Sequence, residues 1–276
     1  MKDLADKVAV VTGAASGIGQ ALATRFAAER MKVVLADVEA GPLAQVADDL
    51  CAAGATVLAV PTDVGDRAAV DALARRAVEA FGAVHVICNN AGVAGPGGPL
   101  WTLTDADWEW TLRVNLWGVV HGIRAFVPLL VAQGEGHVIN TASIAGLISP
   151  QLMGPYVASK HAVVAISEVL ALDLEVTGSP VKVSVLCPGF VRTRIGESQR
   201  NRPAHLADTS SHPAAALAAN MVQQAVAGGT SPDDVAEQVV AAIREERFYV
   251  LTHPEMTGAV HHRNNDIVQG RYPRLP

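Results

Sequence analysis

The sequence predicts an α/β protein with a seven-stranded, mainly parallel sheet and helices on both of its faces. Short apolar runs alternate with segments of helical periodicity along most of the chain, which is the pattern of repeated βαβ units. The chain has 276 residues, of which 50% are hydrophobic and 17% charged, so it can build a large core. Domains of this class reach such a length without splitting, and we expect residues 1–276 to form a single domain.

The first half of the chain is expected to contain four strands and three helices. Val8–Val11 is a short apolar run, and the glycines and helical pattern that follow it indicate a buried strand. In order, we expect a strand at 8–11, a helix at 21–29, a strand at 33–36, a helix at 42–53, a strand at 56–60, a helix at 67–81 and a strand at 85–88.

The second half continues the alternation and begins with a long helix at 104–133. Thr104 suits the N-cap of this helix, and Asp105 and Asp107 lie in its first turn, where carboxylates interact favourably with the helix dipole. Another helix is expected to begin at Ser231-Pro232-Asp233-Asp234, which combines a cap, a proline and acidic residues. The other expected elements are a strand at 137–140, a helix at 156–176 and strands at 181–186 and 248–251.

Residues 196–230 differ in composition from their surroundings. The segment is rich in alanine and polar residues and contains Pro203 and Pro213. Long insertions of this kind are often loops that close over a ligand. We therefore expect a mobile substrate lid at 196–230, within the single domain.

A glycine-rich turn joins the first strand to the first helix. The turn contains Gly13, Ser16, Gly17, Ile18 and Gly19. An arrangement of strand, glycine turn and helix places backbone N–H groups and a helix N-terminus beneath a phosphate, so we expect these residues to bind a dinucleotide. The spacing is not the G-x-G-x-x-G pattern, and the Gly-Lys-Ser/Thr of a nucleoside-triphosphate loop is missing from the turn.

Tyr156 and Lys160 are four residues apart, so on a helix both side chains project from the same face. A phenol ionises near pH 10, and lowering its pKa to about 7 requires roughly 4 kcal/mol of preference for the anion. One positive charge at about 4 Å supplies approximately that amount at an effective dielectric constant of about 20. We therefore expect Lys160 to lower the pKa of Tyr156 and to make it a general acid or base, with Ser143 thirteen positions before it.

Several polar or glycine residues directly follow the predicted strands. Ligands of parallel sheets bind beyond the carboxyl ends of the strands, so these residues are expected to share one edge of the sheet. They are Gly13, Asp37, Asp63, Asn89, Ser143 and Pro188.

These motifs resemble those of the short-chain dehydrogenase/reductase family. The resemblance extends from about Lys7 to about Thr252 and implies a doubly wound, Rossmann-type fold with nicotinamide-dependent hydride transfer. The motifs, in family order and spacing, are T-G-x-x-x-G-I-G, Asn89-Asn90-Ala91-Gly92, Asn115, Ser143, Y-x-x-x-K and Pro188-Gly189.

The resemblance also implies roles for individual residues. Ser143 would hold the reacting oxygen, Tyr156 would transfer its proton, and Lys160 would also contact the nicotinamide ribose. Asn115, in the long helix, would anchor a water molecule that passes protons from Lys160 to solvent. Beyond the glycine turn, the implied contacts on the adenosine side are Asp37, Asp63 and Val64, with Asn89, Asn90, Ala91 and Gly92 beside them. The implied contacts at the nicotinamide are Pro188, Gly189, Val191 and Thr193. Tyr156 and Lys160 are also expected to contact the cofactor.

We expect NAD as the cofactor. Asp37 follows the second strand, where a carboxylate can accept hydrogen bonds from the adenosine ribose hydroxyls. The 2′-phosphate of NADP carries about −1.5 to −2 charges, which Asp37 would repel. Neither the glycine turn nor Val38 offers an arginine or lysine to compensate.

The substrate is expected to be a small hydrophobic secondary alcohol or ketone. The residues predicted to surround it are mostly apolar: Trp101, Ile144, Leu147, Leu152, Met153, Phe190 and Ile195. Two alternatives remain open: an NADP-dependent carbonyl or ketoacyl reductase, and a non-catalytic dinucleotide-sensing protein.

Charge and cysteine content exclude other classes of function. The net charge is −6 without a basic cluster, which argues against a nucleic-acid or membrane partner. Three cysteines without metal-binding spacing indicate a reducing compartment, and we expect a cytoplasmic protein without a membrane span. His261-His262 lacks a third ligand nearby in sequence, so no metal is expected. The family resemblance suggests a homotetramer.

Overall fold

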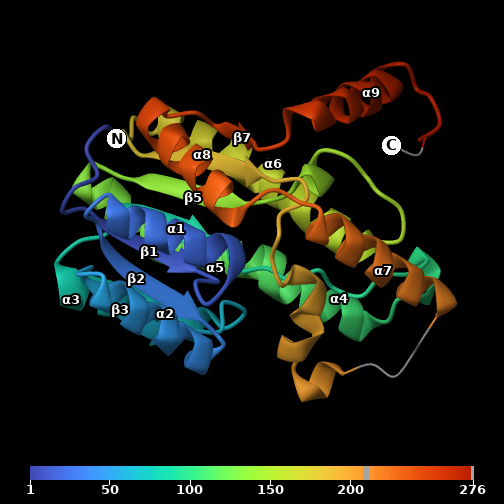
Figure 1. Ribbon diagram of the computed structural model, residues 1–276. Helices are drawn as coiled ribbons and strands as arrows, with labels where there is room; N and C mark the ends of the chain where they lie inside the picture. The colour runs from blue at the N-terminus through green and yellow to red at the C-terminus, as the bar shows by residue number, and fades with distance from the viewer. Residues whose placement is uncertain (208–211, 275–276) are drawn as a thin grey trace.

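Seven strands form one sheet in which every hydrogen-bonded pair is parallel (Figure 1). The computed structural model describes residues 1–207 and 212–274. The strands lie in the order β3-β2-β1-β4-β5-β6-β7, which confirms the predicted seven-stranded sheet. They are β1 (Val8–Thr12), β2 (Lys32–Asp37), β3 (Val57–Pro61), β4 (Val86–Asn89), β5 (His137–Thr141), β6 (Lys182–Cys187) and β7 (Tyr249–Leu251). The predicted strand ends differ from these by at most one residue, a normal uncertainty of such boundaries.

Helices cover both faces of the sheet, as a doubly wound fold requires. Successive residues of a strand point to opposite faces, so Ala9 and Val11 pack into one core layer while Val8 and Val10 pack into the other. The first layer contains α1 (Gly17–Ala28), α2 (Ala40–Ala52) and α8 (Pro232–Glu245). The second contains α3 (Arg67–Phe81), α5 (Gly118–Gln133) and α6 (Gly154–Val176).

The strand order reverses between β1 and β4, and this reversal positions the site. From β1 the chain adds β2 and β3 on one side, then crosses to add β4 to β7 on the other. Connections on the two sides diverge at such a switch point and leave a crevice beyond the carboxyl ends of the strands.

The predicted long helix is present but consists of three parts. α4 (Asp105–Leu112) continues through a π-helical turn, η2 (Arg113–Trp117), into α5. Thr104 caps α4 with Asp107 in a reciprocal capping box, as expected for its start. By length and mean hydropathy (1.5), Asp105–Gln133 could cross a membrane, a test that core helices also pass. Here it packs against α3, α6, β4 and β5.

The last part of the chain contains elements that the sequence did not reveal. The predicted lid comprises η4 (Ile195–Asn201), η5 (Ala204–Leu206) and α7 (Pro213–Ala227), while its residues 208–211 lie outside the described residues. After β7, η6 (Pro254–Met256) leads into α9 (Thr257–Val268), which projects from the body of the protein (Figure 1). The sequence of α9 lacks the apolar stripe by which helices are predicted, and Asp266 is the one residue that the helix buries.

Candidate active site

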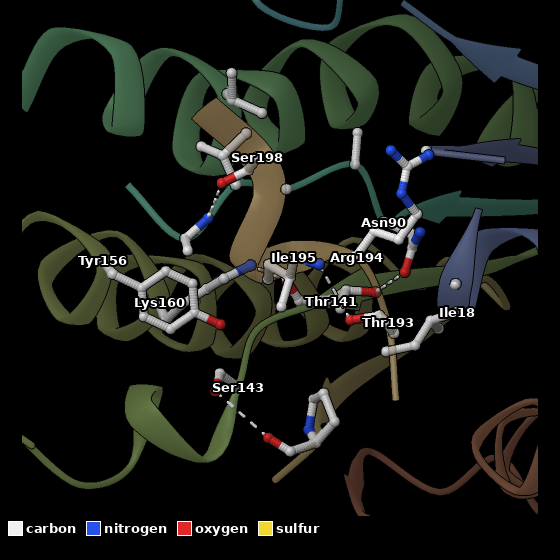
Figure 2. Close-up of a pocket in the computed structure, with 18 of the residues that line it drawn as sticks. Ile18, Asn90, Thr141, Ser143, Tyr156, Lys160, Thr193, Arg194, Ile195 and Ser198 are labelled. Carbon is white, nitrogen blue, oxygen red and sulfur yellow. Dashed lines mark hydrogen bonds between the residues drawn. The ribbon is translucent and has the colours of Figure 1, made fainter. Parts of the chain in front are cut away.

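A cavity of about 590 Å³ lies along the carboxyl ends of the strands (Figure 2). Residues that follow β1 to β6 all contribute to its wall, so the predicted convergence at one sheet edge is found. The predicted site residues in the wall are Gly13, Ser16, Gly17, Ile18, Asp37, Asp63, Val64, Asn90, Ala91, Gly92, Ser143, Tyr156, Lys160, Pro188, Gly189, Val191 and Thr193.

The glycine turn forms a backbone cradle at one side of the cavity. Gly13 and Gly17 have φ angles of +69° and +56°, which favour glycine. A Cβ atom at Gly17 would lie 2.9 Å from Thr193 Cγ2, so a side chain there would collide with the opposite wall. Ser16 precedes α1 without capping it through its side chain, which leaves the first N–H groups of the helix available to an anion.

Asp37 lies at the end of β2 and borders the same cradle. Its Oδ2 accepts a hydrogen bond from the Ala15 N–H at 3.0 Å, and its Oδ1 accepts one from the Glu39 N–H at 3.0 Å. The carboxylate is therefore fixed in orientation. Each oxygen retains a lone pair for a further donor.

Thr12 and Asn90 tie the cradle to the neighbouring strands. Thr12 Oγ1 accepts hydrogen bonds from the N–H groups of Asn90 and Ala91 at 2.9 and 3.0 Å. Asn90 Nδ2 donates to the Thr12 carbonyl at 3.0 Å, and Thr141 Oγ1 donates to Asn90 Oδ1 at 3.2 Å. This network fixes the turn after β4 against β1 and β5.

The Asp63 carboxylate already has two partners in the folded protein. Oδ1 accepts the Gly65 N–H at 2.8 Å, and Oδ2 pairs with Arg113 Nη2 at 2.7 Å. Val64 follows in the wall, and its carbonyl accepts a hydrogen bond from His121 Nδ1 at 2.9 Å. Arg113 also lines the cavity, a contribution that its position in the long helix did not suggest.

Three predicted site residues lie behind the wall, and Asn89 is one of them. Asn89 is buried and donates through Nδ2 to Asn140 Oδ1 at 2.9 Å, so it links β4 to β5. Gly19 faces the turn itself, because a Cβ atom there would lie 2.0 Å from the Gly13 carbonyl oxygen. Both residues shape the cradle from behind.

Asn115 is the third residue behind the wall, and it lies in the π-helical turn rather than in regular helix. Its Oδ1 accepts the Val93 N–H at 2.8 Å, and its Nδ2 donates to the Val93 carbonyl at 2.9 Å and to Ser159 Oγ at 3.2 Å. The side chain is fully buried. It therefore fixes the chain after β4 against α6, immediately behind the catalytic candidates.

Tyr156, Ser143 and Lys160 meet at the floor of the cavity. Figure 2 shows the Tyr156 hydroxyl directed toward Ser143, which follows β5, while Tyr156 and Lys160 extend from the first turns of α6. Ser143 Oγ donates to the Pro188 carbonyl at 3.4 Å and accepts the Ala145 N–H at 3.1 Å. The first bond is long and weak, so the hydroxyl can turn to a ligand.

The amine of Lys160 is held beneath the tyrosine ring. Nζ donates to the Thr141 carbonyl at 2.9 Å and lies 5.6 Å from the centre of the Tyr156 ring. The residue is buried, and burial lowers the pKa of Lys160 to about 8. Two of the three ammonium protons remain available for other acceptors.

The pKa of Tyr156 is not lowered in the structure, in contrast to the expectation from the spacing of Tyr156 and Lys160. Burial raises the pKa of the Tyr156 hydroxyl above its usual value, and the hydrogen bond with Ser143 acts in the opposite, lowering direction. The spacing of Tyr156 and Lys160 gives no information on burial, and desolvation of the buried phenol outweighs its hydrogen bond with Ser143.

The loop after β6 carries the other predicted contacts and has an unexpected support. Val191 pairs with Thr230 in an isolated β-bridge, and Thr193 faces the glycine turn. His253 accepts the Gly189 N–H at Nδ1 (3.1 Å), so its Nε2 carries the proton and donates to the Phe190 carbonyl at 3.0 Å. His253 follows β7, and no pattern in the sequence marks it as a site residue.

The wall opposite the glycine cradle is mostly apolar, as expected, but its members differ in part from the prediction. Ile144, Met153, Phe190 and Ile195 line the cavity. Leu147 and Leu152 lie outside the wall, and Trp101 is 87% exposed. Apolar side chains that the sequence did not single out complete this end: Trp110, Val114, Ile148, Val222, Val226, Met256 and Ala259. The last two belong to η6 and α9, which reach the cavity from the C-terminal part of the chain.

Residues 195–202, which we call the strap, cross the cavity between its two ends (Figure 2). The Ala94 N–H donates to the buried Ser198 Oγ at 3.1 Å, and Arg202 forms a buried ion pair with Asp107 at 2.8 Å. Arg200 reaches the end that contains Asp37 and lines the cavity there. The glycine turn and Val38 offer no arginine, as noted from the sequence, but this distant segment supplies one.

Comparison with known proteins assigns the architecture. The family model described as short chain dehydrogenase matches residues 7–204. The chain belongs to the short-chain dehydrogenase family. A crystal structure of a short-chain dehydrogenase/reductase from Burkholderia phymatum, in complex with NAD, is 48% identical, covers 100% of this chain and 99% of its own, and superposes with a TM-score of 0.98.

Two curated short-chain dehydrogenases also match over most of the chain. The CLA biosynthesis dehydrogenase/reductase of Lactiplantibacillus plantarum is 35% identical over 99% of this chain and 97% of its own length. The 1-deoxy-11-beta-hydroxypentalenate dehydrogenase of Streptomyces avermitilis is 38% identical over 96% and 91%, respectively. As a member of this family, the protein is an oxidoreductase of hydroxy or keto substrates with a nicotinamide dinucleotide cofactor, which confirms the predicted class.

Of the two adjacent histidines near the C-terminus, His262 lies beside a carboxylate of α9. Within residues 1–207 and 212–274, no group of three or more histidine, cysteine or carboxylate side chains is arranged to hold a metal. His262 Nε2 lies 3.4 Å from Asp266 Oδ2, and Asp266 also pairs with Arg271 and Arg274 at 2.7 Å each. This cluster fastens residues 271–274 to α9.

Proposed function

We propose that this short-chain dehydrogenase transfers a hydride between NAD(H) and a hydrophobic secondary alcohol or ketone. The observation that carries the proposal is the convergence of the Tyr156 and Ser143 hydroxyls at the floor of a cavity, between an apolar wall and a glycine cradle. The cradle offers N–H groups to phosphates, and the apolar wall offers space for a carbon skeleton. One cavity thus accommodates both reactants.

The described residues fit a bound NAD. The free N–H groups of the first turn of α1 and the cradle at Gly13 and Gly17 would hold the pyrophosphate. Asp37 would accept hydrogen bonds from the adenosine ribose hydroxyls, and Thr193 with the Val191 backbone would hold the carboxamide. When bound, NAD supplies the hydride acceptor, and the protein has to orient the substrate and move one proton.

Tyr156 serves as the general base in alcohol oxidation and as the general acid in ketone reduction. Its phenolate removes the hydroxyl proton of the alcohol, while the Ser143 hydroxyl donates a hydrogen bond to the same oxygen. The weak Ser143–Pro188 bond can be exchanged for this one at little cost. Two hydroxyls from separate elements therefore fix the reacting oxygen.

Lys160 and Asn115 complete the proposed proton path. Lys160 keeps two ammonium protons for a ribose hydroxyl and for the phenolate, and its positive charge favours the anionic form of Tyr156 once that form arises. Asn115 would hold a water molecule at the π-helical turn, through which Lys160 exchanges protons with solvent. The side-chain hydrogen bonds of Asn115 are used within the protein, so its backbone would hold this water.

The apolar wall supports a hydrophobic substrate rather than a sugar or an ionised acid. The relative from S. avermitilis is named for a hydroxypentalenate and that from L. plantarum for CLA biosynthesis. We infer a substrate of related, mainly hydrocarbon character. Because cellular NAD is mostly oxidised, alcohol oxidation is the proposed direction.

The remaining proposals concern organisation. Residues 1–276 would act as one domain, in which the segment 196–230 serves as the substrate lid and α7 contributes Val222 and Val226 to the wall. The exposed apolar residues Val169, Leu172 and Val176 of α6 would meet other copies in a cytoplasmic homotetramer. Light scattering would measure the oligomeric state.

The proposed function is tested by screening NAD reduction with secondary alcohols of graded size, terpenoid and steroid alcohols included. NADP and the corresponding ketones with NADPH are run in parallel. We expect NADH formation with at least one bulky apolar alcohol. Activity confined to NADPH and ketones would favour the carbonyl or ketoacyl reductase alternative, and dinucleotide binding without turnover would favour a sensing protein.

A further inference from the structure

A carboxylate beside the cofactor cradle meets the strap at the end of the cavity that contains Asp37. Glu39 Oε1 accepts hydrogen bonds from Arg200 Nε and Nη2 at 3.0 and 2.5 Å and from Asn201 Nδ2 at 2.7 Å. The two charged side chains are mostly shielded, with exposed fractions of 19% for Glu39 and 26% for Arg200. Arg200 accordingly holds the pKa of Glu39 below its usual value.

The pair of Glu39 and Arg200 lies beside Asp37, the proposed contact of the adenosine ribose. Glu39 is two residues beyond Asp37, and its N–H donates to Asp37 Oδ1 at 3.0 Å. Asp37, Glu39 and Arg200 all line the same cavity. The guanidinium therefore lies at the end of the crevice where a 2′-phosphate would be placed.

The described arginines of the cavity wall all have a carboxylate partner. Arg113 pairs with Asp63 at 2.7 Å, and Arg194 pairs with Glu197 at 2.9 Å. Arg200 pairs with Glu39. A phosphate binds an arginine that can present free N–H donors to it. The wall thus contains guanidinium groups whose charge is already balanced.

We propose that Glu39 is a second determinant of cofactor choice, because it keeps Arg200 paired and unable to bind the 2′-phosphate of NADP. The inference rests on the proposed use of NAD by this site. Asp37 disfavours the 2′-phosphate by repulsion, and Glu39 adds its own negative charge while occupying the cation that would otherwise compensate.

The strap would keep Arg200 in place after the loss of Glu39. On one side of Arg200, Ser198 is fixed to Ala94, and on the other Arg202 is fixed to Asp107. Both anchors are buried and independent of Glu39. A neutral residue at position 39 would therefore release the guanidinium without removing it from the cavity.

The test measures dissociation constants of NADH and NADPH by calorimetry, independently of turnover. Wild type is compared with Glu39→Gln, Arg200→Met and the double variant. A charge-assisted contact to phosphate is worth about 10- to 100-fold in affinity. We expect Glu39→Gln to lower the dissociation constant of NADPH relative to that of NADH by about that factor. Adding Arg200→Met in the double variant should reverse this change.

Arg200→Met alone should weaken NADPH binding further, because the Glu39 carboxylate then faces the phosphate without a partner. Glu237→Gln is the charge-matched control, since Glu237 of α8 pairs with Arg25 of α1 outside the cavity wall. Its ratio of NADPH to NADH dissociation constants should equal that of wild type.

Two outcomes would overturn the inference. Either the ratio for Glu39→Gln stays within about threefold of wild type, or the double variant keeps the whole shift, so that Arg200 takes no part. A wild-type protein that binds neither dinucleotide would instead refute the proposed function, and the inference with it.

Discussion

His253 fixes the peptide group of Gly189 through a hydrogen bond of 3.1 Å between the Gly189 N–H and Nδ1. Thr252 Oγ1 lies 2.7 Å from the same nitrogen, and Nε2 binds the Phe190 carbonyl. The Pro188 carbonyl of this loop accepts the hydroxyl of Ser143. The imidazole therefore supports the loop that borders both Ser143, the proposed catalytic serine, and the proposed carboxamide site.

Replacing His253 should impair turnover through the position of this loop. In His253→Leu the two hydrogen bonds to the loop, at Gly189 and Phe190, are lost, each worth about 0.5–1.5 kcal/mol, and we expect kcat/KM to fall about tenfold or more. His253→Asn keeps an acceptor near Nδ1 and should recover most of the activity. Steady-state kinetics with the best alcohol of the screen measure both variants, and equal activity of His253→Leu and wild type would refute the role.

Asn115 should be important for stability as well as for turnover. Asn115→Ala leaves the buried Val93 N–H and carbonyl without partners, which costs on the order of 3 kcal/mol. Urea unfolding measures the free energy of unfolding, with exposed Asn264→Ala in α9 as the control, for which we expect less than about 0.5 kcal/mol. A similar, small loss in both variants would show that the Asn115 network contributes little.

Lys160 should make the stability of the cofactor-free protein depend on alkaline pH. Its folded-state pKa of about 8 is below the value of about 10.4 in an unfolded chain, so between these values the unfolded state binds more protons. The free energy of unfolding then rises with pH through this group. Between pH 8 and 9.5 we expect wild type to gain on the order of 2 kcal/mol relative to Lys160→Met.

The measurement is urea unfolding of both proteins at a series of pH values, with exposed Lys2→Met as the control for the loss of a lysine. A stability difference between wild type and Lys160→Met that is constant from pH 7 to about pH 10 would contradict a lowered pKa of Lys160.

Val222 should limit the size of the substrate, because it belongs to α7 and lines the apolar end of the cavity. Val222→Phe adds volume there, and we expect kcat/KM for a bulky alcohol to fall about tenfold more than for 2-butanol. The neighbouring Met221 is 50% exposed and lies outside the wall, so Met221→Phe serves as the matched control. Equal effects of Val222→Phe on both alcohols would place the substrate elsewhere.

Much of the sheet edge could be predicted because its signals are local. Each strand is an apolar run, and Gly13, Asp37, Ser143 and Pro188 follow such runs directly. The parallel topology then brings them together, whatever the details of the loops. Tyr156 and Lys160 needed only the period of the helix to share a face.

The remaining features depend on contacts between distant segments. Arg200 meets Glu39 across 161 positions, and His253 meets Gly189 across 64. No local pattern encodes these approaches. Asn89 shows the converse, because its place in the motif suggested a cofactor contact, while its side chain is buried beside Gly122. The pKa of Tyr156 depends on burial, which spacing alone does not give.

The most direct test of proton transfer by Tyr156 is the turnover number of Tyr156→Phe for NADH formation, with NADH binding measured on the same preparation. Loss of the acid–base group should lower kcat by about two to four orders of magnitude and leave the dissociation constant of NADH within about threefold of wild type. A kcat within a few-fold of wild type, with the cofactor still bound, would contradict the assignment of Tyr156 as the proton-transferring residue.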